Sequence, residues 1–213
     1  MGIIIGWFIL IICITIHEFA HAYMADRLGD PTAKIYGRMT LNPIAHIDPI
    51  GTVLLPLLML ISGSGFFIGW AKPTPFDPFN LKNPKRDAAL ISVAGPASNL
   101  LFAVILSVIL RFPLPGILGL FLYGLLPVII QINVLLAIFN LIPIHPLDGF
   151  KVVAGLLPKK YYYEWMELEK YGMIFLLLLI FPFFGSSPVF RLITPVVNLI
   201  LSILLPHGSG GVI

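Results

Sequence analysis

Charged side chains are scarce in this chain, at 11% of 213 residues, whereas a soluble domain carries roughly 25%. Apolar residues make up 58% and the mean hydropathy is +0.99, which excludes a soluble globular protein and indicates an integral membrane protein. A single cysteine, Cys13, excludes an intrachain disulfide. The small basic excess, a net charge of +3, indicates membrane topology rather than nucleic-acid binding.

Long apolar runs are present instead, and they predict an all-α polytopic membrane protein with one membrane-embedded domain over residues 1–213. We expect about five transmembrane helices, because each crossing takes ~20 residues. Three core helices are expected at 3–25, 89–111 and 117–142, with accessory C-terminal helices at 165–184 and 188–205.

Residues 51–69 are long enough to cross a membrane, but Pro56 and the run SGSG at 62–65 interrupt them. If the segment spans, the basic residues divide five to eight between the two sides. If it enters and returns, eleven lie on one side and only Arg111 and Arg191 on the other. The positive-inside rule favours a re-entrant hairpin, in a multi-pass protein of the cell (plasma or inner) membrane with its N-terminus outside and its C-terminus cytoplasmic.

A short strand is expected between the first apolar run and the hairpin. Apolar or small residues at 35, 37, 39 and 41 alternate with polar residues at 34, 36, 38 and 40, and this period of two is typical of a strand. The pattern predicts a small interfacial β element at 33–41.

Three ionisable residues, His17, Glu18 and His21, occur inside the first apolar run, in the motif HEFAH. An unpaired ionisable group in the bilayer core costs at least ~2.5–3.5 kcal/mol, so three of them need compensation. Residues four apart share a helix face, so both imidazoles can bind one metal ion. Glu18 is offset by about 100° and suits a general base that takes a proton from water. A polar cluster bonded to neighbouring helices accounts for one such residue but not for three at this spacing, so the motif predicts a zinc site.

Catalytic zinc commonly takes a carboxylate as its third protein ligand. Asp148, in NLIPIHPLDG, follows the run 117–142, and Pro143 and Pro146 end that helix, so we expect Asp148 on an extended segment lining a cavity. A rise of 1.5 Å per residue puts His17 about 21 Å from Ile3, toward the inner end of a ~30 Å core. Asp148 reaches that depth only if its helix runs parallel to the first, which agrees with a hairpin that does not cross.

Taken in order, the motifs HEFAH, GPASN (95–99) and NLIPIHPLDG (140–149) resemble those of the site-2 protease family of intramembrane zinc metalloproteases. The resemblance covers roughly residues 8–25, 87–112 and 120–150. It implies that His17, His21 and Asp148 bind Zn²⁺ and that Glu18 is the catalytic base. We expect a short, core-only form without a PDZ-like or regulatory domain.

The resemblance also suggests roles for residues around the metal. Asn140 resembles the family's asparagine that holds substrate backbone, and Asn99 is a second candidate for a polar contact with substrate. His145 is a candidate outer-shell partner of the zinc ligands. For Gly95 and Pro96, plain helix packing is the preferred interpretation.

These features predict an intramembrane zinc endopeptidase that cleaves in or near transmembrane segments of membrane-protein or peptide substrates, within the lipid bilayer. A helical substrate must unwind locally, and the segments 33–41 and 68–76 are candidates to pair with it as strands. The alternative is a membrane metal-ion transporter that uses the same His/His/Asp site, since intramembrane ionisable residues also mark ion pathways. A transport site, however, needs no glutamate beside the histidine pair.

Overall fold

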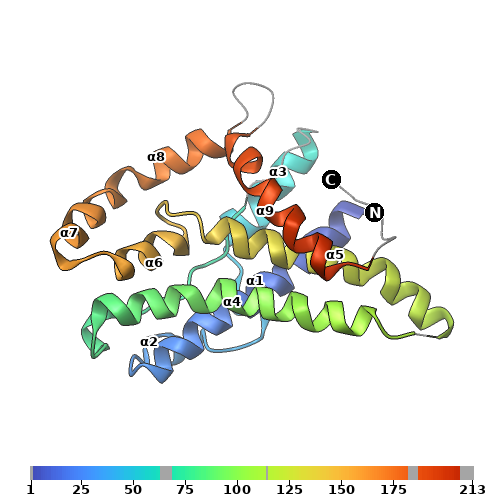
Figure 1. Ribbon diagram of the computed structural model, residues 1–213, viewed down its shortest axis with the longest axis horizontal. Coiled ribbons are helices and arrows are strands. Elements are labelled where there is room, and N and C mark those ends of the chain that lie inside the picture. The colour runs from blue at the N-terminus through green and yellow to red at the C-terminus, as the bar shows by residue number, and fades with distance from the viewer. Residues whose placement is uncertain (1, 63–68, 114, 182–186, 207–213) are drawn as a thin grey trace.

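The computed structural model describes residues 2–62, 69–113, 115–181 and 187–206 (Figure 1). Within these ranges the chain forms helices, turns and loops but no β-strand, which confirms the all-α class. Three of the described helices are long and apolar enough to cross a membrane: α1 (Gly2–Arg27), α4 (Pro84–Leu110) and α5 (Gly116–Asn140). The protein is therefore an all-α membrane protein, while the count of five crossings stays a prediction.

The three long helices run in alternating directions. His21 of α1 contacts Ile91 of α4, and Cys13 contacts Asn99. Residue numbers at these contacts fall along α1 as they rise along α4, so the two helices are antiparallel. α5 packs against α4 and in turn runs antiparallel to it (Figure 1). α1 and α5 are consequently parallel, and the end of α5 leads into α6 (Asp148–Leu156) beside the histidines of α1.

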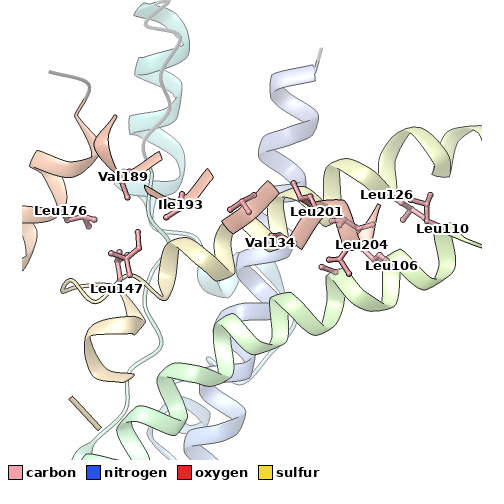
Figure 2. Close-up of a cluster of buried hydrophobic side chains, with 14 residues drawn as sticks. Leu106, Leu110, Leu126, Val134, Leu147, Leu176, Val189, Ile193, Leu201 and Leu204 are labelled. Carbon is pink, nitrogen blue, oxygen red and sulfur yellow. The ribbon is translucent and has the colours of Figure 1, made fainter. Parts of the chain in front are cut away.

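The helix α9 (Pro188–Leu204) covers α5 with one apolar face. Its buried residues recur at intervals of three or four, so they lie on a single side of the helix. Figure 2 shows this face packed against side chains of α4 and α5, and Leu147 and Leu176 lie at the other end of the cluster. The labelled residues from the long helices are Leu106, Leu110, Leu126 and Val134. This apolar packing supports the end of α5, from which the α5–α6 loop departs.

The accessory segment expected at 165–184 is two helices rather than one. α7 (Lys159–Glu167) and α8 (Glu169–Ile180) meet at Leu168, and residues 182–186 lie outside the described part of the chain. Figure 1 shows α7 and α8 forming an arc to one side of the long helices. At 12 and 17 residues, α8 and α9 are shorter than an ordinary crossing helix.

The connection between α1 and α4 leaves the end of α1 and returns to it. It contains α2 (Thr32–Ile35), η1 (Pro43–His46), η2 (Pro49–Leu54), α3 (Leu55–Ser62) and η3 (Pro78–Asn80). The backbone N–H of Trp70 donates to Gly51 O at 3.2 Å, and the Thr52 hydroxyl donates to Trp70 O at 2.8 Å. The two ends of the expected hairpin 51–69 therefore lie together, while residues 63–68, which include most of the SGSG run, lie outside the described residues.

The β element expected at 33–41 is wrong. Residues 32–35 form α2, and turns and bends follow as far as residue 41. Asp30 accepts a hydrogen bond from the Thr32 N–H in a turn that precedes the helix, whose N-cap is Pro31. Gly37 has a φ of +66° and Arg38 N–H donates back to Ala33 O, which is the usual way for glycine to end a helix. The turn at Asp30 and the C-cap at Gly37 outweigh the alternating pattern.

Candidate metal centre

α1 carries His17, Glu18 and His21 toward the centre of the molecule. The two imidazole centroids lie 4.6 Å apart, with their planes at 88°. Both histidines are buried, with 5% and 7% of their surfaces exposed. The spacing of four residues thus brings two ring nitrogens to one point on the helix face, as the sequence predicts.

α6 brings Asp148 to the same point. Asp148 Oδ2 lies 3.0 Å from His17 Nε2 and 3.3 Å from His21 Nε2. One ligand atom from each residue falls within 4.8 Å of the others. Asp148 is the first residue of a helix and not part of an extended segment, and turns and bends over residues 141–147 connect α5 to α6.

The other nitrogen of each ring is hydrogen-bonded. His21 Nδ1 lies 2.7 Å from Ile91 O, and His17 Nδ1 lies 2.6 Å from Asn99 Oδ1. A backbone carbonyl only accepts, so Nδ1 of His21 carries the hydrogen and Nε2 presents its lone pair toward Asp148. Such a partner on the second nitrogen fixes the tautomer and the ring orientation of a metal-binding histidine.

Gly95 of α4 faces the two imidazoles. A β-carbon at this position would lie 2.5 Å from His21 Nε2 and 2.6 Å from His17 Nε2, closer than atoms in van der Waals contact. The absence of a side chain keeps open the space beside both lone pairs. Two imidazoles and one carboxylate around such a space are a donor set typical of catalytic zinc, so the residues present fit the metal.

Glu18 is held from the side by the segment 70–77, here named the strap. The backbone N–H of Thr74 donates to Glu18 Oε2 at 2.8 Å, and the Thr74 hydroxyl donates to Glu18 O at 3.1 Å. Because Pro73 and Pro75 carry no N–H, Thr74 has the only backbone donor in this three-residue run. The carboxylate of Glu18 is therefore oriented by a specific contact as well as by its place on α1.

Lys151 adds a positive charge one helical turn after Asp148. Its Nζ lies 4.4 Å from the centroid of the Phe76 ring in the strap. Burial lowers the pKa of Lys151 below its ordinary value, although the negative charges of Asp148, Glu169 and Glu18 oppose this effect. Its place beside the site depends on the helix that begins at Asp148, where the sequence predicts an extended segment.

The remaining predicted residues lie around the metal group, not in it. Asn99 is fully buried and contacts His17, and its contact with substrate stays a prediction. Asn140 donates to Leu136 O at 2.9 Å, and His145 Nε2 lies 3.2 Å from Glu169 Oε1. Contact of Asn140 with substrate and of His145 with a zinc ligand stay predictions.

Comparison with known proteins supports this chemistry. The family model of Peptidase family M50 matches residues 5–116. YwhC of Bacillus subtilis, named as a candidate zinc metalloprotease, is 41% identical over 183 residues, 83% of this chain and 80% of its own. Rip2 of Mycolicibacterium smegmatis, with the same description, is 33% identical over 152 residues, 68% of this chain and 56% of its own.

A more distant relative, zinc metalloprotease MJ0392 of Methanocaldococcus jannaschii, is 27% identical over 155 residues, 73% of this chain and 35% of its own. The chain thus spans less than two thirds of the Rip2 and MJ0392 sequences, and no solved structure matches it. These relatives give no support to the transporter alternative. Because the family model covers more than half of the chain and a 41% identical relative spans most of it, this chain belongs to peptidase family M50 and is an intramembrane zinc metalloprotease.

Proposed function

We propose that His17, His21 and Asp148 are the zinc ligands and that Glu18 is the general base. With these residues the enzyme hydrolyses peptide bonds in or near transmembrane segments of membrane-protein substrates. The observation that carries this proposal is the convergence of the three ligand atoms within 4.8 Å, from residues up to 131 positions apart. The space kept open by Gly95 beside both imidazoles supports it.

Zinc bound there would supply Lewis acidity, which lowers the pKa of a water molecule and polarises a scissile carbonyl. Glu18, next to His17 on α1, takes a proton from the attacking water and delivers it to the nitrogen of the departing amine. The Thr74 N–H holds Glu18 Oε2 during this transfer. Burial of both histidines keeps bulk water away from their lone pairs.

Asn140 is our candidate for holding the substrate backbone. Its Nδ2 donates to Leu136 O, which uses one amide hydrogen and leaves the second hydrogen and the oxygen for another partner. It stands at the last residue of α5, where the chain turns toward Asp148. Asn99 is a weaker candidate for substrate, because its amide is already bonded to groups of α1 and α5.

The membrane orientation follows from charge and from the return of the chain. Eleven basic residues lie on one side if residues 51–69 enter the membrane and come back. The hydrogen bond between Trp70 and Gly51 supports such a return. We place the N-terminus outside and the C-terminus in the cytoplasm of a cell-membrane protein.

The substitution Glu18→Gln tests the proposal. The amide cannot take the proton, so cleavage of a membrane-protein substrate should fall roughly 10²- to 10⁴-fold, the usual contribution of a general base. Zinc content should stay at the wild-type level, because the three ligands are intact. The exposed Glu164 of α7 supplies the matched control, and Glu164→Gln should cleave normally. Full activity of Glu18→Gln would rule out Glu18 as the base.

The substrates can be found with the same pair of proteins. Membrane proteomes of cells with wild-type or Glu18→Gln protein should differ in fragments that end within or near transmembrane segments. Identical proteomes would speak against proteolysis of membrane proteins in that cell.

A further inference from the structure

A chain of polar side chains lies in the apolar interior behind the metal centre. Asn133 of α5 and Asn99 of α4 are both fully buried, and Cys13 of α1 is buried beside them. The chain therefore joins all three long helices at one depth. Asn133 belongs to none of the motifs that predicted the site.

Hydrogen-bond partners determine the direction of every bond in this chain. Asn133 Nδ2 donates to Ile129 O at 2.8 Å and to Cys13 Sγ at 3.0 Å. Asn99 Nδ2 donates to Cys13 O at 3.1 Å and to Asn133 Oδ1 at 2.7 Å. Carbonyl oxygens only accept, so each amide nitrogen must face them and each amide oxygen must accept.

Asn99 Oδ1 therefore accepts from His17, and Nδ1 of His17 must carry the hydrogen. The Nε2 atom of His17 is then left with its lone pair toward Asp148. If the Asn99 amide turned over, it would present N–H groups to Nδ1 and favour the tautomer with hydrogen on Nε2, which cannot bind a metal. Among the described residues, Asn133 Oδ1 and Cys13 O are the acceptors of the Asn99 amide that oppose this turn.

We propose that Asn133 is a positioning residue for zinc: through Asn99, it fixes the ring orientation and the tautomer of His17. Cys13 Sγ completes the arrangement by accepting the second amide hydrogen of Asn133. Groups that orient metal ligands from outside the coordination sphere typically change metal affinity roughly 10- to 100-fold. This inference rests on the proposed ligation of zinc by His17.

The test measures metal affinity of the full chain in detergent, by competition with a chromophoric chelator, together with the absorption spectrum of the Co²⁺-substituted protein. Asn133→Leu, similar in volume, should bind zinc roughly 10- to 100-fold more weakly and shift the Co²⁺ bands. Ser107→Ala is the matched control. It removes another buried interhelical hydrogen bond, from Ser107 to Leu204 O, far along α4 from the histidines, and should leave both measurements unchanged.

A double-mutant cycle distinguishes positioning from a general loss of packing. Asn133 acts through Asn99, so Asn133→Leu should have little further effect on zinc affinity in an Asn99→Leu background. Equal effects in both backgrounds, or an Asn133→Leu affinity within twofold of wild type, would overturn the inference.

Cys13→Ala covers the case in which Asn133→Leu does not fold, because the smaller side chain is easily accommodated. It removes the Sγ acceptor and should weaken zinc binding severalfold, whereas Cys13→Ser keeps an acceptor and should restore it. No difference between these two variants would count against the relay. Failure of the wild-type chain to bind zinc would instead refute the proposed ligands themselves.

Discussion

The hydrogen atom that Gly95 carries in place of a side chain keeps the metal centre open. Helix packing alone would tolerate alanine at many glycine positions, but here a methyl group would overlap both Nε2 atoms. The small residue is thus required by the imidazoles of α1 and not by the backbone of α4.

We expect Gly95→Ala to lose most of its zinc, since the methyl group occupies the space next to both lone pairs. Zinc content of the purified protein should fall from near-stoichiometric to a small fraction. Gly124→Ala, on α5 where a β-carbon meets nothing within 4 Å, should retain its zinc. Equal zinc content in the two variants would show that α4 does not face the ligands as described.

Single residues of the site differ in how far the sequence predicts them. His17, Glu18 and His21 follow from spacing within one helix, and Asp148 from depth along two parallel helices. Asn133, Gly95 and Thr74 depend on which faces of separate segments meet, and no periodicity of one segment contains that information. Gly95 had a signal in the motif GPASN, but the sequence alone favours plain packing.

Among the elements, the strap is the one whose conformation matters most to Glu18. Replacing Thr74 by proline removes the N–H that holds Glu18 Oε2. A hydrogen bond to a charged group contributes about 1.5–3 kcal/mol, so kcat should fall roughly 10- to 100-fold if the bond serves to orient the base. Zinc content should not change.

Thr74→Ser retains both donors and is the control for this substitution; its kcat should remain near wild type. An unchanged kcat in Thr74→Pro would show that α1 alone orients Glu18.

Asp30 ties the strap to the end of α1 and makes that attachment depend on pH. Burial alone would raise the pKa of Asp30, but hydrogen bonds from Thr32, Asn80 and the Asp77 N–H hold it below its ordinary value. A lowered folded pKa stabilises the protein above the unfolded value of about 3.9, and this stabilisation is lost as pH falls through the folded pKa.

Asp30→Asn should therefore lower the thermal unfolding temperature at pH 7, and the difference from wild type should shrink toward pH 3. Asp26→Asn, which breaks a 3.6 Å ion pair with the exposed Lys34, should have a much smaller effect at pH 7. A pH-independent difference for Asp30→Asn would mean that its charge is not what stabilises the strap.

The elements themselves were predictable where they are long and apolar. The expected helices 3–25, 89–111 and 117–142 differ from α1, α4 and α5 by a few residues at their ends. The short segment at 33–41 failed because period-two alternation over so few residues is weaker than the turn at Asp30 and the helix C-cap at Gly37. In such a short element, the residues at its two ends decide the structure more than the alternation of polar and apolar residues does.

The three long helices expose large apolar side chains, and the polar groups around the metal centre are buried between them. Large apolar side chains such as Phe8, Leu101 and Phe121 are exposed on the long helices, while the histidines and Asn99 are buried. This inversion is what a bilayer requires, because lipid solvates the outer surface and gives no partner to polar groups.

Topology can be tested on the whole molecule with single cysteines, because the native Cys13 is buried. Lys34, Lys82 and Arg111 are exposed, and each can be replaced by cysteine and treated with a membrane-impermeant thiol reagent. If residues 51–69 return, Lys34→Cys and Lys82→Cys react from the cytoplasmic side and Arg111→Cys from the opposite side. Reaction of the first two from opposite sides would mean that the segment crosses.

The contacts of the strap also fix its length. Its two ends are tied at Trp70 and Asp77, and the N–H that holds the Glu18 carboxylate lies between two prolines. Removing one residue from an extended chain shortens it by about 3.3 Å, more than a hydrogen bond tolerates. Deleting one residue from this stretch should therefore disturb the Glu18 contact more than substituting any of its residues other than Thr74 and the two flanking prolines.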